Sequence, residues 1–107
     1  MNRMKQLIEV WESESRAEPA VNDISLKLTA GDYARLCALE ELFPARTREQ
    51  LVRDLLATAL DEFEEALPYI PGKKVVGEDE FGDPLYEDVG LTPKFEALAR
   101  KYYLDPP

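Results

Sequence analysis

One short strand pattern followed by two helical patterns constrains what this chain can fold into. In residues 23–29 apolar side chains alternate with polar ones, which is the period of a strand with one buried face. Helical spacing of apolar residues follows, over residues 30–43 and again over residues 47–67. The apolar members of the strand are Ile24, Leu26 and Leu28. The sequence therefore predicts the order strand, helix, helix within residues 21–67.

Both helical patterns have recognisable starts. Thr29 stands three residues before Asp32, and Thr47 stands three residues before Gln50. This spacing is typical of a capping box, in which the two residues satisfy each other's backbone N–H groups at the first turn. Pro44 ends the first helix because proline has no backbone N–H to donate.

A lone strand leaves its backbone N–H and C=O groups without partners, and a core this short buries too little surface to fold alone. Antiparallel pairing of two copies across a two-fold axis would meet both needs, with four helices covering one face of the ribbon. We therefore predict a homodimer. Its core residues are Ile24, Leu26, Leu28, Leu36, Leu39, Leu51, Leu55 and Leu56.

This stretch resembles the ribbon-helix-helix superfamily of Arc-type and methionine-repressor-type proteins. The matching residues are Ile24 to Thr29, Arg35-Leu36, Ala38-Leu39, Thr47, Gln50 to Arg53 and Leu55-Leu56. The turn at residues 43–47 departs from the family pattern because it lacks the usual Gly. The resemblance implies an α+β, mostly helical fold with a ribbon-helix-helix core.

The same resemblance implies where DNA would bind. In that arrangement the outward strand positions enter the major groove, and the N-terminus of the second helix meets a phosphate. The base-contacting candidates are Asp23, Ser25 and Lys27, and the phosphate-contacting candidates are Arg46, Thr47, Arg48 and Arg53. A net charge of −9 opposes DNA binding, although these basic residues gather on one side. A transcriptional regulator is favoured, and a dimeric protein-interaction module that binds no DNA stays open.

The composition argues against catalysis. The chain has no His, and its one Cys, Cys37, stands within the first helical pattern of the core. The usual proton shuttle and the commonest metal ligand are therefore missing. The carboxylates are many, but none is paired with an evident acid, base or nucleophile. We expect no enzyme activity, cofactor, metal site or small-molecule substrate.

Residues 1–20 precede the core. A helical stripe in residues 1–11 is expected to pack on its own domain or on the partner subunit, with docking to another protein as the alternative. Residues 12–20 are expected to be a linker. The stripe consists of Met4, Leu7, Ile8 and Trp11. Because Lys5 and Glu9 interrupt this stripe, we expect that it is neither a signal peptide nor a membrane segment. We therefore expect a cytoplasmic protein.

Residues 68–107 are predicted to form a short hairpin and a last helix. Strands are expected at residues 73–76 and 84–87, with Gly82 at the tight point of the turn. The carboxylates of the connection lack the spacing of a calcium site and are expected to be solvated. A helix is predicted over residues 92–103, with Thr92 as its N-cap. Its apolar stripe is Phe95, Leu98, Ala99 and Tyr102.

The whole chain, including residues 69–73 and 82–88, also resembles a family of small bacterial proteins labelled pilin assembly protein or type 1 pilus tip component. This resemblance implies a role in pilus production. A tip component needs an export signal, and donor-strand pilus subunits are β-sandwiches. The residues therefore fit an accessory factor in pilin assembly or its control better than a place in the fibre.

Overall fold

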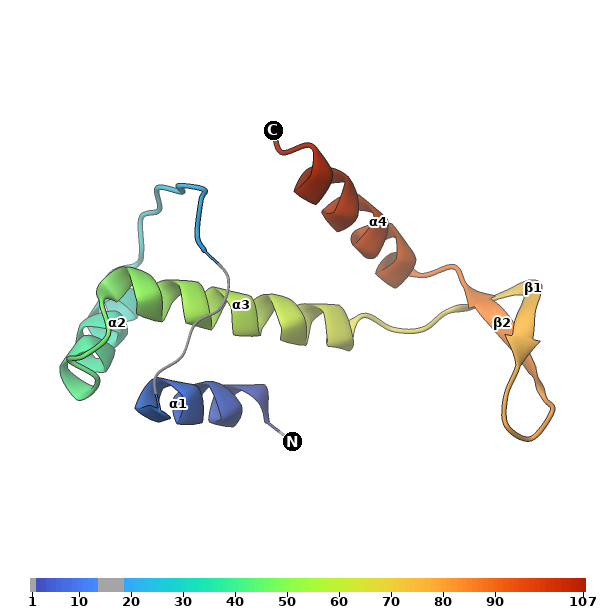
Figure 1. The fold of residues 1–107 in the computed structure, drawn as a ribbon, viewed down its shortest axis with the longest axis horizontal. Helices are drawn as coiled ribbons and strands as arrows, with labels where there is room; N and C mark the ends of the chain where they lie inside the picture. The colour runs from blue at the N-terminus through green and yellow to red at the C-terminus, as the bar shows by residue number, and fades with distance from the viewer. Residues whose placement is uncertain (1, 14–18) are drawn as a thin grey trace. The chain divides into compact units, whose positions relative to one another are not determined.

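The structure is a computed structural model that describes residues 2–13 and 19–107. Along the described chain the elements are α1 (Arg3–Ser13), α2 (Ala30–Leu42), α3 (Arg48–Ala66), β1 (Pro71–Glu78), β2 (Pro84–Asp88) and α4 (Leu91–Leu104) (Figure 1). The predicted α+β, mostly helical class is confirmed. The chain divides into two compact units, an N-terminal unit, Met1–Ala59, and a C-terminal unit, Leu60–Pro107. Part of the linker predicted over residues 12–20 lies outside the described residues.

The core of the N-terminal unit is where α1 meets α3. Leu7 and Trp11 of α1 are buried against Leu51, which is 0% exposed. The ring of Trp11 meets the ring of Phe43 edge-on, with centroids 5.4 Å apart. Partly buried hydrophobic residues complete this cluster: Met4, Leu39, Phe43 and Leu55. The N-terminal stripe therefore packs within its own chain, as predicted, while Ile8 stays exposed at its margin.

The starts of α2 and α3 are capped at the residues that the sequence predicts. Thr29 Oγ1 accepts a hydrogen bond from the backbone N–H of Asp32 at 3.2 Å. Before α3 the box is reciprocal, because the Thr47 N–H donates to Gln50 Oε1 at 2.9 Å and the Gln50 N–H donates to Thr47 Oγ1 at 3.1 Å. These bonds satisfy N–H groups that a helix leaves without internal partners.

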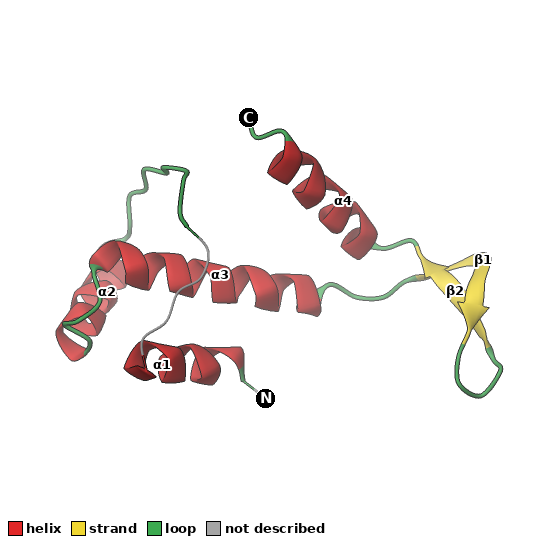
Figure 2. Ribbon diagram, in the orientation of Figure 1, coloured by secondary structure: helices red, strands yellow, loops and turns green. Residues whose placement is uncertain are grey.

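Residues 19–29, ahead of α2, form a loop that belongs to no helix or sheet of the described chain (Figure 2). Ile24 is 82% exposed and Leu26 is 69% exposed. The strand predicted over residues 23–29 thus has no partner strand within the described part of one chain. Since the prediction requires a second copy, the ribbon and the ribbon-helix-helix core stay predictions.

The C-terminal unit contains the predicted hairpin, with longer strands than expected. β1 and β2 pair antiparallel, from Pro71 opposite Asp88 to Glu78 opposite Pro84, with two irregularities in register. Gly82 has φ 85°, a left-handed conformation that suits glycine. Asp79 Oδ1 accepts the N–H groups of Phe81 and Asp83, which closes the turn. The predicted position of Gly82 at the tight point is confirmed.

The start of α4 corrects the sequence prediction. The N-cap is Gly90, so the prediction of Thr92 as the cap is wrong by two residues. Asp88 Oδ1 accepts from the N–H groups of Ile70 and Gly90, which fixes the chain as it leaves β2. A Cβ on Gly90 would lie 2.9 Å from the carbonyl oxygen of Pro68. The helix therefore begins where the hairpin ends, ahead of the threonine.

Candidate nucleic-acid interface

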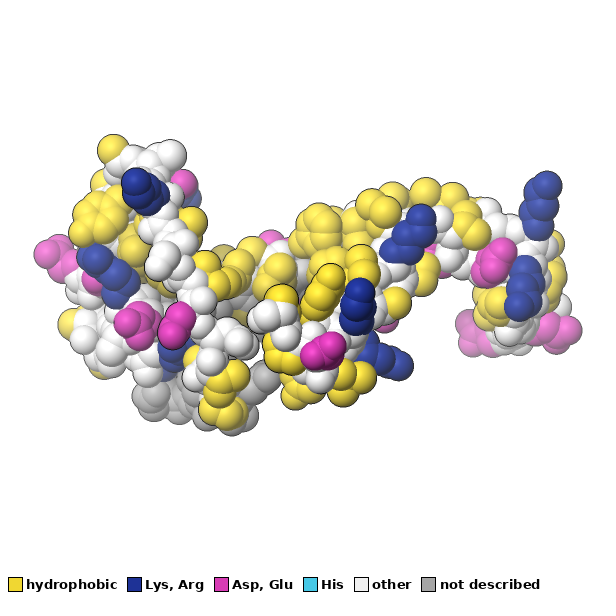
Figure 3. Space-filling model, turned by 90° about the horizontal axis from the view of Figure 1, so that it is seen from above, with side chains coloured by type: hydrophobic (Ala, Val, Ile, Leu, Met, Phe, Trp, Pro, Cys, Tyr) yellow, Lys and Arg dark blue, Asp and Glu magenta, His cyan; other side chains and the backbone are white. Residues whose placement is uncertain are grey.

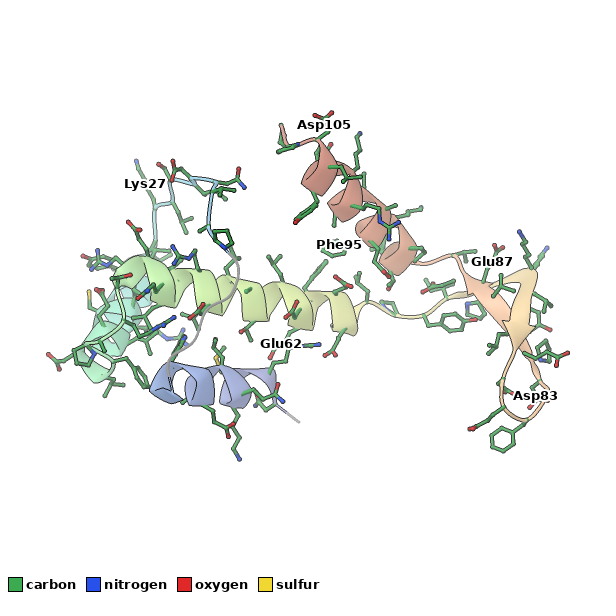
Figure 4. The ribbon with its side chains drawn as sticks, viewed as in Figure 1. Lys27, Glu62, Asp83, Glu87, Phe95 and Asp105 are labelled. Atoms are coloured by element: carbon green, nitrogen blue, oxygen red, sulfur yellow. The ribbon has the colours of Figure 1, made fainter. Side chains whose placement is uncertain are left out.

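The three base-contacting candidates lie together in the loop of residues 23–29, which we call the ribbon segment. Asp23, Ser25 and Lys27 occupy alternate positions there and all are exposed. The side chain of Lys27 points away from α2 (Figure 4). The apolar residues between them are exposed as well, so both faces of the ribbon segment are open in one chain. A strand with one polar and one apolar face is the form that a shared ribbon would need.

Arg46 lies in the turn between α2 and α3 and is buried. Its Nη2 donates to Asp54 Oδ2 at 2.5 Å, and the two side chains are 3% and 1% exposed. Trp11 Nε1 donates to the same carboxylate oxygen at 2.6 Å. Burial in an ion pair argues against the phosphate contact predicted for Arg46, because that charge is already committed to Asp54.

Asp54 joins three parts of the N-terminal unit through these two bonds. The acceptor is on α3, one donor is on α1, and the other is in the turn between α2 and α3. A carboxylate away from water is stable only when it is paired and hydrogen-bonded. Sequence reasoning missed this residue, although Asp54 stands at helical core spacing between Leu51 and Thr58, both buried. A charged residue inside an apolar stripe was the available indication.

The side chain of Arg48 is partly exposed to solvent, but its guanidinium is already paired with a carboxylate. Its Nε donates to Glu40 Oε1 at 2.9 Å and to Oε2 at 3.2 Å, and Nη2 also lies 2.9 Å from Oε1. Its guanidinium lies over the ring of Tyr33, 5.1 Å from the centroid. The hydrogen bond to Glu40, followed by that to Tyr33, raises the pKa of Arg48 further above its ordinary value. A phosphate would have to compete with Glu40 for this side chain.

Thr47 and Arg53 complete the phosphate-contacting candidates. The hydroxyl and backbone N–H of Thr47 take part in the capping box, so Thr47 positions the start of α3. Arg53 is exposed on α3. Of the candidate cations, Lys27, Arg48 and Arg53 are exposed, although Arg48 is paired with Glu40, and Arg46 is buried.

The predicted dimer core separates into two groups. Leu36 and Leu51 are buried, and Leu39 and Leu55 are partly buried. The other members are exposed in one chain: Ile24, Leu26, Leu28 and Leu56. These exposed residues are the ones that a second copy would have to cover.

The described residues hold no group of three or more His, Cys, Asp or Glu side chains placed to bind a metal ion. Cys37 is a free, partly buried cysteine, 3.9 Å from Arg48 Nη2. None of the helices in the described chain combines the length and the apolar composition needed to cross a membrane.

No family model, curated protein or solved structure matches this chain. The ribbon-helix-helix and pilin-assembly resemblances therefore stay predictions drawn from the residues alone.

Proposed function

We propose that this chain is a homodimeric ribbon-helix-helix DNA-binding protein that regulates transcription. Two ribbon segments pair antiparallel across a two-fold axis, and their polar face enters the major groove. The observation that carries this proposal is the ribbon segment itself: its apolar and polar residues alternate, all are exposed, it has no partner strand in the described chain, and it stands directly ahead of a capped helix.

Pairing of two ribbon segments supports the proposal energetically. Each segment would gain partners for its backbone N–H and C=O groups, which an isolated strand lacks. The same pairing would bring Ile24, Leu26 and Leu28 of both copies against one face, where helices can cover them. Because a two-fold interface makes each contact twice, every residue buried in one copy is buried in the other.

The polar face of the ribbon offers a modest set of cations. Lys27 would stand at a base edge, while Arg48 and Arg53 would contact phosphates on each side of the two-fold axis. Four arginine contacts in a dimer predict that the logarithm of the affinity falls with the logarithm of salt concentration with a slope of about −3 to −4. With a net charge of −9, binding should be weak outside low salt.

The DNA test compares alanine variants of Arg53 and Lys27 with an Arg35→Ala control. Arg35 is exposed on α2, paired with Asp32, and stands outside the candidate set. Against a pool of random-sequence duplexes, Arg53→Ala should reduce the salt slope by about two units in the dimer, one for each copy. Lys27→Ala should flatten sequence preference by about 1–3 kcal/mol at one position in each half-site. Arg35→Ala should change neither quantity.

Dimerisation is tested separately by Leu26→Asp. An aspartate at this position would place a charge in the shared core. The cost is several kcal/mol, which is of the same order as the free energy of unfolding of a whole domain. Sedimentation should show that the ribbon dimer is lost, because the particle that the variant forms should have a smaller mass than the particle that the native protein forms. A native chain that sediments as a folded monomer would refute the dimer.

A second candidate function is a dimeric protein-interaction module that binds no DNA, as an accessory factor in pilin assembly or its control. It is favoured by the engagement of two candidate cations, since Arg46 is buried with Asp54 and Arg48 is paired with Glu40. The same DNA assay decides between the two functions. Equal affinity of the native chain and a Lys27→Ala/Arg53→Ala variant at low salt would select the interaction module.

A further inference from the structure

We propose that the C-terminal unit carries a second self-association surface, whose occupant is the same surface of another copy of this chain. The surface is an apolar groove of about 260 Å³ between the end of α3 and the start of α4. Phe63 and Phe95 meet there, with ring centroids 5.5 Å apart, and Phe95 points toward α3 in Figure 4. We call it the terminal groove; it is lined by Phe63, Leu67, Leu91, Lys94, Phe95 and Leu98.

Both helices present apolar residues at the spacing of a helix-bundle seam. The end of α3 carries Leu60 and Phe63, Leu67 follows directly after it, and α4 carries Leu91, Phe95, Leu98 and Tyr102. Alternating steps of three and four residues keep such side chains on one side of a helix. Two helices with seams of this kind bury only part of each seam, and packing into a four-helix bundle buries the rest.

The exposure of these residues agrees with an unfilled seam. Leu98 is 52% exposed, and Leu60, Leu91 and Tyr102 are exposed to a similar degree. In residues 60–107 no hydrophobic side chain reaches full burial. Figure 3 shows hydrophobic side chains gathered along α4, with basic side chains among them. Contiguous apolar surface of this kind marks an interaction site.

Charge complementarity identifies the occupant as a second copy. Residues 60–66 of α3 contain four acidic and no basic residues, whereas α4 contains three basic residues and one acidic residue. In a two-fold pair the acidic helix of each copy can lie against the basic helix of the other, so the match is made twice. Glu64 and Lys94 border the two seams, next to Phe63 and Phe95, and are placed to set this pairing.

The terminal groove is independent of the ribbon segment. The groove lies in the C-terminal unit and the ribbon segment lies in the N-terminal unit. A chain with two different two-fold surfaces can join two ribbon dimers into an assembly of four chains. The inference holds whether or not the ribbon contacts DNA.

The test is sedimentation of the full chain with Leu98→Asp, compared with Leu104→Asp. Leu104 is 75% exposed and stands outside the seam of the same helix, so it is a matched leucine. Leu98→Asp should halve the mass of the native particle, and Leu104→Asp should leave the mass unchanged. Leu26→Asp should halve it through the ribbon, and the variant carrying both Leu26→Asp and Leu98→Asp should be monomeric.

If Leu98→Asp leaves the native mass unchanged, the proposal is overturned. The same result is expected if the terminal groove binds a different protein, so that outcome also overturns it. If the ribbon prediction alone fails, Leu26→Asp keeps the native mass while Leu98→Asp still halves it. A charge exchange guards against misfolding of Leu98→Asp. Glu64→Lys and Lys94→Glu chains should each lose association, and mixing them should restore it as a mixed complex; no restoration would also overturn the assignment.

Discussion

The two units of this chain build stability in different ways. The N-terminal unit buries Leu51 completely and encloses an ion pair between Arg46 and Asp54. The C-terminal unit has a hairpin, a helix and an aromatic contact between Phe63 and Phe95, and most of its large hydrophobic side chains are exposed. Both units have amphipathic helices. In the N-terminal unit three helices, α1, α2 and α3, meet in one core. In the C-terminal unit the end of α3 and α4 meet through the rings of Phe63 and Phe95.

This difference indicates which residues of each unit a second copy would cover. A helix contributes most of its stability by burying its apolar face, since helical propensity alone is weak. In the N-terminal unit α1 supplies that burial within the chain, and the ribbon segment is left uncovered. In the C-terminal unit the seam of α4 is left uncovered. The exposed apolar residues of each unit therefore mark where a second copy would bind.

The largest effect is expected for Asp54→Ala in the N-terminal unit. Loss of the carboxylate breaks the buried ion pair with the Arg46 guanidinium and removes the hydrogen-bond acceptor of Trp11, at a cost of about 3–5 kcal/mol. Trp11 is the only tryptophan, so its fluorescence reports this unit during denaturation.

Glu62→Ala is the control for Asp54→Ala, since Glu62 is an exposed carboxylate of the same helix. It should change the free energy of unfolding by no more than about 0.5 kcal/mol. If the two variants unfold at the same denaturant concentration, Asp54 does not hold the N-terminal unit together.

A smaller effect is expected for Trp11→Phe. Phenylalanine keeps an aromatic ring against Phe43 but removes the N–H that donates to Asp54. A hydrogen bond to a charged group contributes about 1.5–3 kcal/mol. Helical circular dichroism during denaturation measures the loss, because the variant has no tryptophan. In the Asp54→Ala background the same change should cost less, and equal costs in both backgrounds would show that the two residues act independently.

Local chemistry in the sequence predicts much of this fold. The Thr47 and Gln50 pair marks the start of α3, and Gly82 marks the hairpin turn, because both depend on bonds or dihedral angles within a few residues. The start of α4 was misplaced because Thr92 is a good local cap. Asp88 and Gly90 override it through contacts with residues 68–70, which are distant in sequence.

In the candidate site, too, features that depend on local sequence could be predicted, and features that depend on long-range packing could not. The alternation of the ribbon segment is local, so its polar positions could be predicted, and Lys27 is exposed there. The arginines could not be ranked from sequence. Arg46 and Arg53 look equivalent along the chain, but the packing of α1 encloses Arg46 with Asp54 and leaves Arg53 exposed. Long-range packing decides which cation can reach a phosphate.

The smallest effect separates the two units most cleanly. Gly82→Ala places a Cβ on a residue with φ 85°, which costs about 1–2 kcal/mol. Because the strain is confined to the turn between β1 and β2, amide hydrogen exchange of the hairpin should quicken about five- to thirtyfold. Exchange of amides in α3 near Leu51 should not change.

Gly31→Ala is the matched control for that glycine. Gly31 lies in α2 and a Cβ there would meet nothing within 4 Å, so alanine should stabilise the N-terminal unit by about 0.4–1 kcal/mol. Opposite signs, each confined to its own unit, are expected because the hairpin and the helical core lie in different compact units. Faster exchange throughout the chain in Gly82→Ala would instead show that both units unfold as one.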